Sequence, residues 1–368
     1  MTTVTGQQQA AGPAPAEEEP PKTFVQRLLS AQAFQILAVL LVLVVLFSVA
    51  EPDAFLSVNN FRNIVVNVSI LAIIGVAMTF VIITGGIDLS VGSVLVFSGV
   101  VAAKTMEALG GEGVGVAITG LLVACVSGTL WGLLNGVLVA RAKVPPLIVT
   151  LGTLGMALGG AQILTGGIDV RGAPTVLTDT IGFGRLFGQI PYLSLISLVV
   201  VVLGAVLLHR TRFGRYTYAV GSNGEAARRV GVRADRHLVL VYTLAGFCAG
   251  LAGILNLAFF ASTTIAGQSN TALNVIAGVV IGGTSLFGGI GTIAGTVVGL
   301  FIPAVLQNGF VIMGVQPFWQ QVVVGAFLIA AVYIDQVRRA AAARGASNRR
   351  SLSSRFSRPV GARRKEAQ

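Results

Sequence analysis

The stretch TGGIDLSVGS, residues 84–93, places a carboxylate and several hydroxyl groups between two strongly apolar runs. Its paired glycines predict a break in a helix, which frees backbone donors and acceptors. Asp88 could contact a polar solute that passes this break. Alternatively, its carboxylate could cap the following helix by accepting hydrogen bonds from the amides of Ser90 and Val91. The spacing favours the capping role.

A related pattern, IGGTSLFGG, occurs at residues 281–289. There a glycine pair precedes Ser285 and Leu286, much as the first pair precedes Asp88 and Leu89. The match covers a few positions and is compatible with an internal repeat. The positions predicted to break helices or to line a path for a solute are Gly85, Gly86, Asp88, Ser90, Gly92, Gly282 and Gly283.

A second polar motif, GRYTYAVGSNGEAARRVGVRADR, fills most of residues 209–236. Ser222 or Asn223 could cap a short helix with Glu225 in its first turn, where a negative charge favours the helix dipole, and Gly231 could end it. Such a helix suits docking into a groove of a soluble partner, and the alternative is a solvated basic loop. The positions assigned to docking are Gly221, Asn223, Glu225, Ala226, Ala227, Arg228 and Gly231.

Composition indicates which elements hold these motifs. Of the 368 residues, 54% are hydrophobic and 11% are charged, and the mean hydropathy is +0.84, whereas soluble domains have about 25% charged residues. A helix that crosses a bilayer needs about 20 apolar residues. We therefore expect an all-α integral membrane protein with about ten transmembrane helices, broken at the glycine pairs. The predicted spans are 31–50, 63–87, 89–103, 113–140, 144–168 and 186–208, with four more in the uncharged stretch 238–334.

The distribution of basic residues predicts the orientation, because Lys and Arg near span ends collect on the cytoplasmic side. With the N-terminus inside and ten crossings, most of the 25 basic residues lie on that side. Arg62, Lys104, Arg171 and Arg185 remain on or near the other face. Arginines flank both ends of 238–334, so that stretch must cross an even number of times. Both termini are therefore expected to be cytoplasmic.

Three parts of the chain are predicted. A disordered cytoplasmic tail at 1–30 precedes a transmembrane domain at 31–336, which includes the cytoplasmic loop 209–236, and a disordered basic tail follows at 337–368. The net charge of +11 comes mostly from the topology signal and this Arg- and Ser-rich tail. We therefore expect the tail to be attracted to anionic lipid, and we expect no nucleic-acid partner.

Small and weakly polar residues within the spans have a packing interpretation and a transport interpretation. Glycines four positions apart let helix backbones approach closely in lipid, and packing is the expected role of Gly128, Gly132, Gly136, Gly155, Gly159, Gly246, Gly250, Gly291, Gly295 and Gly299. Polar side chains in the spans could line a path for a neutral solute or could only bond helices to each other. These candidates are Asn67, Thr79, Asn135, Thr150, Thr153, Asn256, Asn274 and Asn308.

Four stretches together resemble a known family. They are TGGIDLSVGS, NGVLVARAKVPPLIVTLGTL, GRYTYAVGSNGEAARRVGV and VIAGVVIGGTSLFGGIGTIAGTVVG, in chain order. They look like the membrane permease subunit of bacterial ABC importers for monosaccharides, of the ribose and xylose type, within the branched-chain amino acid and sugar permease family. The resemblance covers residues 60–335.

The resemblance implies a homodimer of ten-helix subunits in the bacterial inner membrane, two copies of a cytoplasmic ATPase and an extracytoplasmic sugar-binding protein. It also implies that a helix bearing Glu-Ala-Ala, three residues and then Gly docks on the ATPase. Glu225, Ala226, Ala227 and Gly231 match that spacing. ATP binding and hydrolysis in the partner would then move the docked helix, and a path between the permease halves would face alternately out and in.

The chain departs from this family at one phrase. Sugar permeases of this type usually carry an acidic pair before the last glycine pair, in a phrase such as Glu-Leu-Asp-Ala-Ile-Ala, whereas this chain has ALNVIA, with Ala272 and Asn274. Both charges are missing, which bears on the substrate and on the contact with the binding protein. Asn274 can still hydrogen-bond a hydroxylated ligand.

No catalytic residue, metal or cofactor is expected in this chain. It has no G-x-x-x-x-G-K-[ST] phosphate loop, so ATP and Mg are assigned to the partner ATPase. Two alternatives stay open, an ion-coupled secondary transporter of a small neutral solute and a membrane-embedded lipid-sugar transferase. The first needs buried carboxylates or histidines, and 238–334 offers none. The second needs clustered acids, histidines or metal ligands, and the two histidines, His209 and His237, flank the cytoplasmic loop.

Overall fold

The structure is a computed structural model. It describes residues 32–171, 173–266, 268, 270–316, 318–327, 329–330, 332–333 and 336–337. The tails expected at 1–30 and 337–368 lie outside these residues, apart from Val337, which is helical.

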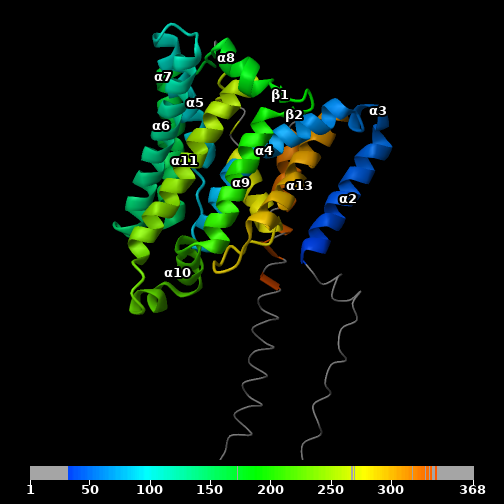
Figure 1. The fold of residues 1–368 in the computed structure, drawn as a ribbon. Helices are drawn as coiled ribbons and strands as arrows, with labels where there is room; N and C mark the ends of the chain where they lie inside the picture. Colours follow the sequence, from blue (N-terminus) through cyan, green and yellow to red (C-terminus); the bar gives the residue numbers. More distant parts are fainter. Residues whose placement is uncertain are drawn as a thin grey trace, which may run out of the picture.

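The described residues form a helical bundle (Figure 1). Seven of the described helices are long and apolar enough to cross a membrane. These helices are α4 (Val58–Ile83), α5 (Val91–Ala108), α6 (Val114–Ala140), α7 (Pro146–Thr165), α9 (Tyr192–Arg210), α11 (Ala234–Phe260) and α13 (Ile293–Ile312). Two other apolar helices are α2 (Gln32–Ala50) and α12 (Thr271–Ile281), and helical backbone resumes at Phe318. The predicted all-α membrane fold is confirmed.

The stretch 238–334 differs from its expected division into four full spans. The short helix α12 has 11 residues, which extend roughly 16 Å at 1.5 Å per residue. A bilayer core is about 30 Å thick, so α12 alone does not cross it. The span predicted at 186–208 also begins later, because residues 185–191 form a strand pair before α9.

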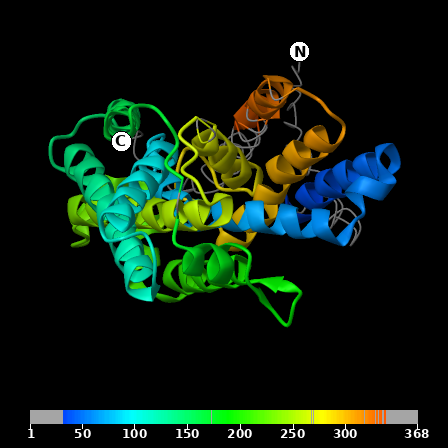
Figure 2. The ribbon, with the colours of Figure 1, turned by 90° about the horizontal axis from the view of Figure 1, so that it is seen from above.

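The short elements gather at the two ends of the bundle (Figure 1). At one end lie α3 (Pro52–Phe55), α8 (Thr175–Leu177), the π-helix η1 (Thr178–Gly182), β1 (Arg185–Leu186) and β2 (Ile190–Pro191). The strands pair antiparallel, with Arg185 opposite Pro191, and their hairpin projects from the edge of the bundle (Figure 2). The opposite end carries α10 (Arg212–Arg229). We call these the hairpin end and the α10 end.

The centre of the bundle is built on α4 and on the α6–α11 pair. Every residue of α4 from Ala72 to Ile83 is buried. The backbones of α6 and α11 touch, because a Cβ added at Gly128 would lie 2.2 Å from the Gly246 carbonyl oxygen, and one added at Gly246 would lie 2.1 Å from the Gly128 oxygen. The glycines expected to pack helices therefore do so in this pair.

The helix α7 is the exception among the predicted glycine contacts. A Cβ added at Gly155 or Gly159 would meet no other atom of the described chain within 4 Å. Gly152, on the same helix, is equally open. Within a single chain, this face of α7 is therefore unpacked, and the packing expected of Gly155 and Gly159 is wrong for the isolated subunit.

Candidate functional site

Both predicted helix breaks are present, and both lie toward the α10 end. After α4 ends at Ile83, Gly85 adopts a φ of +80°, which favours glycine, and α5 begins at Val91. After α12 ends at Ile281, Gly283 has a φ of +97°, and α13 begins at Ile293, after eleven intervening residues in which the chain turns. We call these segments the first break (84–90) and the second break (282–292).

The two breaks meet each other and α10 at one point. The Gly289 amide of the second break donates to the carbonyl oxygen of Ile83 at 2.8 Å. Gly221 of α10 lies against the same two groups, because a Cβ added there would fall 1.7 Å from the Ile83 oxygen and 2.9 Å from the Gly289 nitrogen. We call this contact of Ile83, Gly221 and Gly289 the break junction.

Tyr218 adds a second link between α10 and the second break. Its hydroxyl donates to the Gly291 carbonyl oxygen at 2.6 Å. Partial burial raises the pKa of the Tyr218 phenol, so it stays a neutral hydrogen-bond donor at physiological pH. A helix at the α10 end is thus bonded directly to the loop that separates α12 from α13.

Asp88 sits inside the first break and is 1% exposed. Its Oδ1 accepts hydrogen bonds from the amide of Ser90 at 2.9 Å and from the hydroxyl of Ser90 at 2.6 Å. The contact with the Ser90 amide is as expected, but Val91 is not a partner, because the carboxylate turns back to the Ser90 hydroxyl. Ser90 itself is the N-cap residue of α5, and its side chain makes no capping bond.

A polar network of neutral side chains extends from this carboxylate into α6 and α7. The Asn135 amide donates to the Ser90 hydroxyl oxygen at 2.9 Å, and the Thr153 hydroxyl donates to the Asn135 oxygen at 2.8 Å. Thr150 donates to the carbonyl oxygen of Ile87 at 3.2 Å. Five predicted site residues are therefore brought together around the first break, and all are nearly fully buried: Asp88, Ser90, Asn135, Thr150 and Thr153.

We expect Asp88→Asn to be mild and Asp88→Ala to be severe. Asparagine retains an oxygen that can accept from Ser90, so it should cost about 1 kcal/mol or less of folding free energy. Alanine leaves a buried amide and a buried hydroxyl unpaired, which should cost about 1–3 kcal/mol. Apparent melting temperatures of the two purified variants in detergent measure the difference. If Asn destabilises as much as Ala, the negative charge itself is required at this position.

The docking helix predicted between Asn223 and Gly231 is formed by the last part of α10. Asn223 interrupts α10 with a φ of −162° and a ψ of 97°, and its Oδ1 accepts from the Ala226 amide at 2.9 Å. Gly231, with a φ of +88°, follows the C-cap residue, and its amide donates to the Arg228 oxygen at 3.0 Å. Of the two candidate caps, the structure uses Asn223.

One face of this docking helix packs against the rest of the subunit, and the opposite face is exposed. Ala227 is buried against Val220 and Ala234, and Arg228 donates to Oδ1 of Asp235 at 2.6 Å. Lys143 donates to the same oxygen at 2.7 Å, which ties the α6–α7 turn to the docking helix. The opposite face presents Glu225 and Arg229, each with 83% of its side chain exposed, and Val230, which is 80% exposed.

The other pathway candidates are dispersed. Thr79 and Thr296 share a hydrogen bond of 2.6 Å between α4 and α13. Asn308 donates to Asn60 at the hairpin end, and Asn67 is exposed on α4. The bonds of Thr79 and Asn308 between helices fit the packing interpretation, whereas the exposed Asn67 supports neither interpretation.

Asn256 and Asn274 belong to a different region, near the start of α12. The Asn256 amide donates to Thr264, and its oxygen accepts from Gln268 at 3.0 Å. Gln268 also bonds to the Thr271 hydroxyl. Asn274 is 8% exposed one turn into α12. Thr264, Gln268 and Thr271 were not among the sequence candidates, because they carried no motif.

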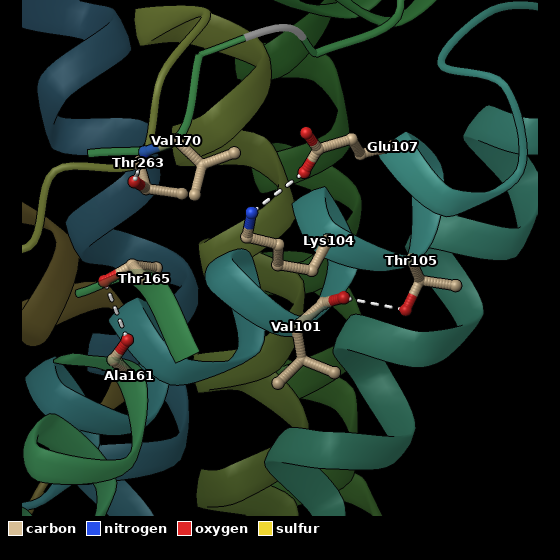
Figure 3. A network of polar contacts seen from close by, with 8 residues as sticks. All are labelled: Val101, Lys104, Thr105, Glu107, Ala161, Thr165, Val170 and Thr263. Carbon is tan, nitrogen blue, oxygen red and sulfur yellow. Dashed lines mark hydrogen bonds and ion pairs between the residues drawn. The ribbon is translucent and has the colours of Figure 1, made fainter. Parts of the chain in front are cut away.

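The hairpin end of α5 and α7 carries local polar contacts (Figure 3). The Val170 amide donates to the Thr263 hydroxyl at 2.8 Å, which fastens the segment after α7 to the segment after α11. Lys104 and Glu107 form an exposed ion pair at 3.0 Å. In the part of the chain that the structure describes, no group of three His, Cys, Asp or Glu side chains could hold a metal ion.

The match of the chain to known proteins is extensive. Residues 60–332 match the family model described as the branched-chain amino acid transport system / permease component. The chain belongs to this permease family. The permease is also 37% identical to the ribose import permease protein RbsC of Escherichia coli K12 over 307 residues, which are 82% of this chain and 93% of that protein.

Two further relatives show a similar degree of identity. The permease is 38% identical to the ribose import permease protein RbsC of Bacillus subtilis 168, across 82% of this chain and 92% of that protein. It is 36% identical to the fructose import permease protein FrcC of Rhizobium meliloti, across 87% of this chain and 91% of that protein. No solved structure matches the chain. The permease is thus a multi-pass membrane protein, and its breaks and docking helix all lie within the matched residues.

Proposed function

We propose that the permease is the transmembrane subunit of an ATP-driven ABC importer for a monosaccharide of the ribose and xylose class. The observation that carries this proposal is the break junction, because it places Gly221, two residues before the docking helix begins at Asn223, against the last residue of α4 and against the second break. Relatives named as ribose and fructose import permeases support the solute class.

In this proposal a cytoplasmic ATPase binds the exposed face of the docking helix, which bears Glu225 and Arg229. The ATPase carries ATP and Mg, and hydrolysis takes place there. Movement of the docked helix pulls on Asn223 and then on Gly221 and Tyr218, which contact the two breaks. The breaks consist of irregular backbone, which can change conformation at lower cost than a continuous helix.

The α10 end is assigned to the cytoplasm. Basic side chains gather there at the ends of α6, α9 and α10, and they include Arg141, Lys143, Arg210, Arg212, Arg215, Arg228 and Arg229. Cytoplasmic loops carry such an excess of Lys and Arg. The permease then lies in a bacterial inner membrane with both termini in the cytoplasm, and the hairpin end faces an extracytoplasmic sugar-binding protein.

We further propose a homodimer. The open glycines of α7, Gly152, Gly155 and Gly159, lie beside the exposed apolar side chains Leu151 and Met156. Small residues on a lipid-exposed helix allow a second helix to approach closely, so this face suits a second copy of the chain. Pairing there would supply the contacts that a single subunit lacks.

The proposed solute is neutral and hydroxylated. The buried polar side chains around the first break are mostly amides and hydroxyls, which match sugar hydroxyls as donors and acceptors. Ala272 and Asn274 stand where related sugar permeases carry the acidic pair, and both are buried. The start of α12 therefore has an amide side chain at this place and no charge.

Reconstitution tests this function. The permease, its ATPase and its binding protein are placed in sealed vesicles, and uptake of labelled ribose or xylose is measured with and without ATP. We expect accumulation against a gradient that requires ATP and all three components. Accumulation by the permease alone would refute the proposal, and so would uptake driven by a pH gradient in the absence of the ATPase.

A further inference from the structure

A groove of about 480 Å³ opens beside the second break at the α10 end. Its walls come from α2, α10, the second break and the start of α13, and include Leu37, Tyr218, Gly283, Ala294 and Val298. This volume lies within the range of about 300–1,000 Å³ that is common for small-molecule sites. The groove is separate from the polar network around Asp88, which lies in the first break.

The groove is hollow because glycines form much of its wall. Five of its lining residues are glycine, namely Gly282, Gly283, Gly289, Gly291 and Gly295. Gly283 and Gly289 have φ values of +97° and +76°, which disfavour any larger residue. A Cβ added at Gly295 would lie 2.1 Å from the Gly282 oxygen. These backbone conformations and close contacts require glycine, so no side chain from these positions enters the groove.

The chemistry of the wall favours a hydrocarbon ligand. The two polar side chains of the wall are already bonded within the protein, since Tyr218 donates to the Gly291 oxygen and the Thr292 hydroxyl oxygen accepts from the Gly295 amide. Among the described residues that line the groove, none has a charged side chain. A hydroxylated solute would lose its water here without gaining partners, which costs free energy. An aliphatic chain meets Ile36, Leu37 and Val298.

The groove is continuous with an apolar surface of α2. Leu37 is 51% exposed, and Leu41 and Val42, one turn further along the helix, are each 63% exposed. An α2 surface of this kind, in a multi-pass membrane protein, faces lipid. Lipid chains therefore have direct access to the groove.

We propose that one acyl chain of a phospholipid, from the bilayer half at the α10 end, occupies this groove. The bound chain contacts Tyr218, Gly283 and Gly291, so it braces the second break at the place where α10 is bonded to it. This inference goes beyond the proposed function, because it holds for any cargo.

Photolabelling tests the proposal. The reconstituted importer is placed in phospholipid vesicles that contain a small fraction of phospholipid with a diazirine in one acyl chain, and labelled peptides are mapped after irradiation. We expect stronger labelling of the peptides with Leu37, Ala294 and Val298 than of the peptide with Leu122, which is 59% exposed on α6. The α6 position is a control for general contact with lipid.

A variant that fills the groove provides the decisive comparison. Ala294 is exposed in the first turn of α13 and lines the groove, so Ala294→Trp should fill the space and lower labelling of Leu37 and Val298 severalfold. Labelling of Leu122 should not change. Leu122→Trp is the matched control and should leave the groove labelled.

Two results would overturn the lipid site. One is groove labelling no stronger than that of Leu122, and the other is labelling that Ala294→Trp does not reduce. Low labelling of the groove would also result if another protein segment covered it, and that outcome counts against the lipid. Co-purification of the ATPase with Ala294→Trp verifies that the variant folds. Because labelling requires neither ATP nor sugar, its outcome is independent of the transport test.

Discussion

Gly221→Ala should abolish ATP-driven uptake while the importer still assembles. The added Cβ would lie 1.7 Å from the Ile83 carbonyl oxygen and 2.9 Å from the Gly289 nitrogen, and both are backbone atoms that cannot turn aside. The first part of α10 must then move away from the break junction, at a cost of about 1–3 kcal/mol or more. Uptake and ATP hydrolysis by reconstituted vesicles measure the effect.

The matched control for Gly221→Ala lies three residues away on the same helix. A Cβ added at Gly224 meets nothing within 4 Å, so Gly224→Ala should keep uptake near the wild-type rate. We also expect Gly221→Ala to bind the ATPase normally, because the docking helix beyond Asn223 is unchanged. Normal uptake by Gly221→Ala would show that the break junction does not transmit movement.

Glu225→Lys should prevent the ATPase from binding without disturbing the fold. Its side chain is 83% exposed and lies 4.0 Å from Arg229, which is equally exposed, so its replacement removes little from the subunit itself. The new positive charge at the start of the docking helix opposes the helix dipole by only about 0.3–1 kcal/mol. The loss should therefore appear in co-purification of the ATPase and in uptake, and not in the melting temperature.

A charge reversal at the hairpin end is the control for Glu225→Lys. It shows whether loss of ATPase binding is specific to the docking helix or follows from any added positive charge. Glu107 is 61% exposed at the hairpin end of α5, and Glu107→Lys should leave co-purification of the ATPase unchanged. Glu225→Gln should fall between wild type and Glu225→Lys if the charge of Glu225 is recognised. Normal ATPase binding by Glu225→Lys would place the docking surface elsewhere.

Local signals predicted the breaks and the docking helix well. The glycine pairs 85–86 and 282–283 follow directly on the ends of α4 and α12, although the pair Gly159 and Gly160 lies inside the continuous helix α7. Asn223 and Gly231 act through their own backbone neighbourhood. The break junction could not be predicted in this way, because Ile83, Gly221 and Gly289 are distant in the chain and carry no pattern that pairs them. Tyr218 lay inside a recognised motif, but its bond to Gly291 depends on packing.

The shortness of α12 was missed for a related reason. An uncharged stretch shows where spans are possible and not where each one ends. The polar residues Thr264, Gln268 and Thr271 form a bonded cluster with Asn256, which no motif in the sequence indicates. Ser90 was correctly predicted as a hydrogen-bond partner of Asp88. Whether the carboxylate of Asp88 accepts from the Ser90 hydroxyl or from the Val91 amide depends on side-chain geometry, which a sequence pattern does not give.

The contact between α6 and α11 restricts how this subunit can change shape. With Gly128 facing Gly246, main chain rests on main chain, and sliding either helix by a residue would push a larger side chain into a space that holds none. The helices α6 and α11 must therefore move together as one rigid body. Any opening of the subunit therefore has to come from movement of the surrounding helices relative to this rigid pair. The glycine turns of the first and second breaks can serve as the hinges.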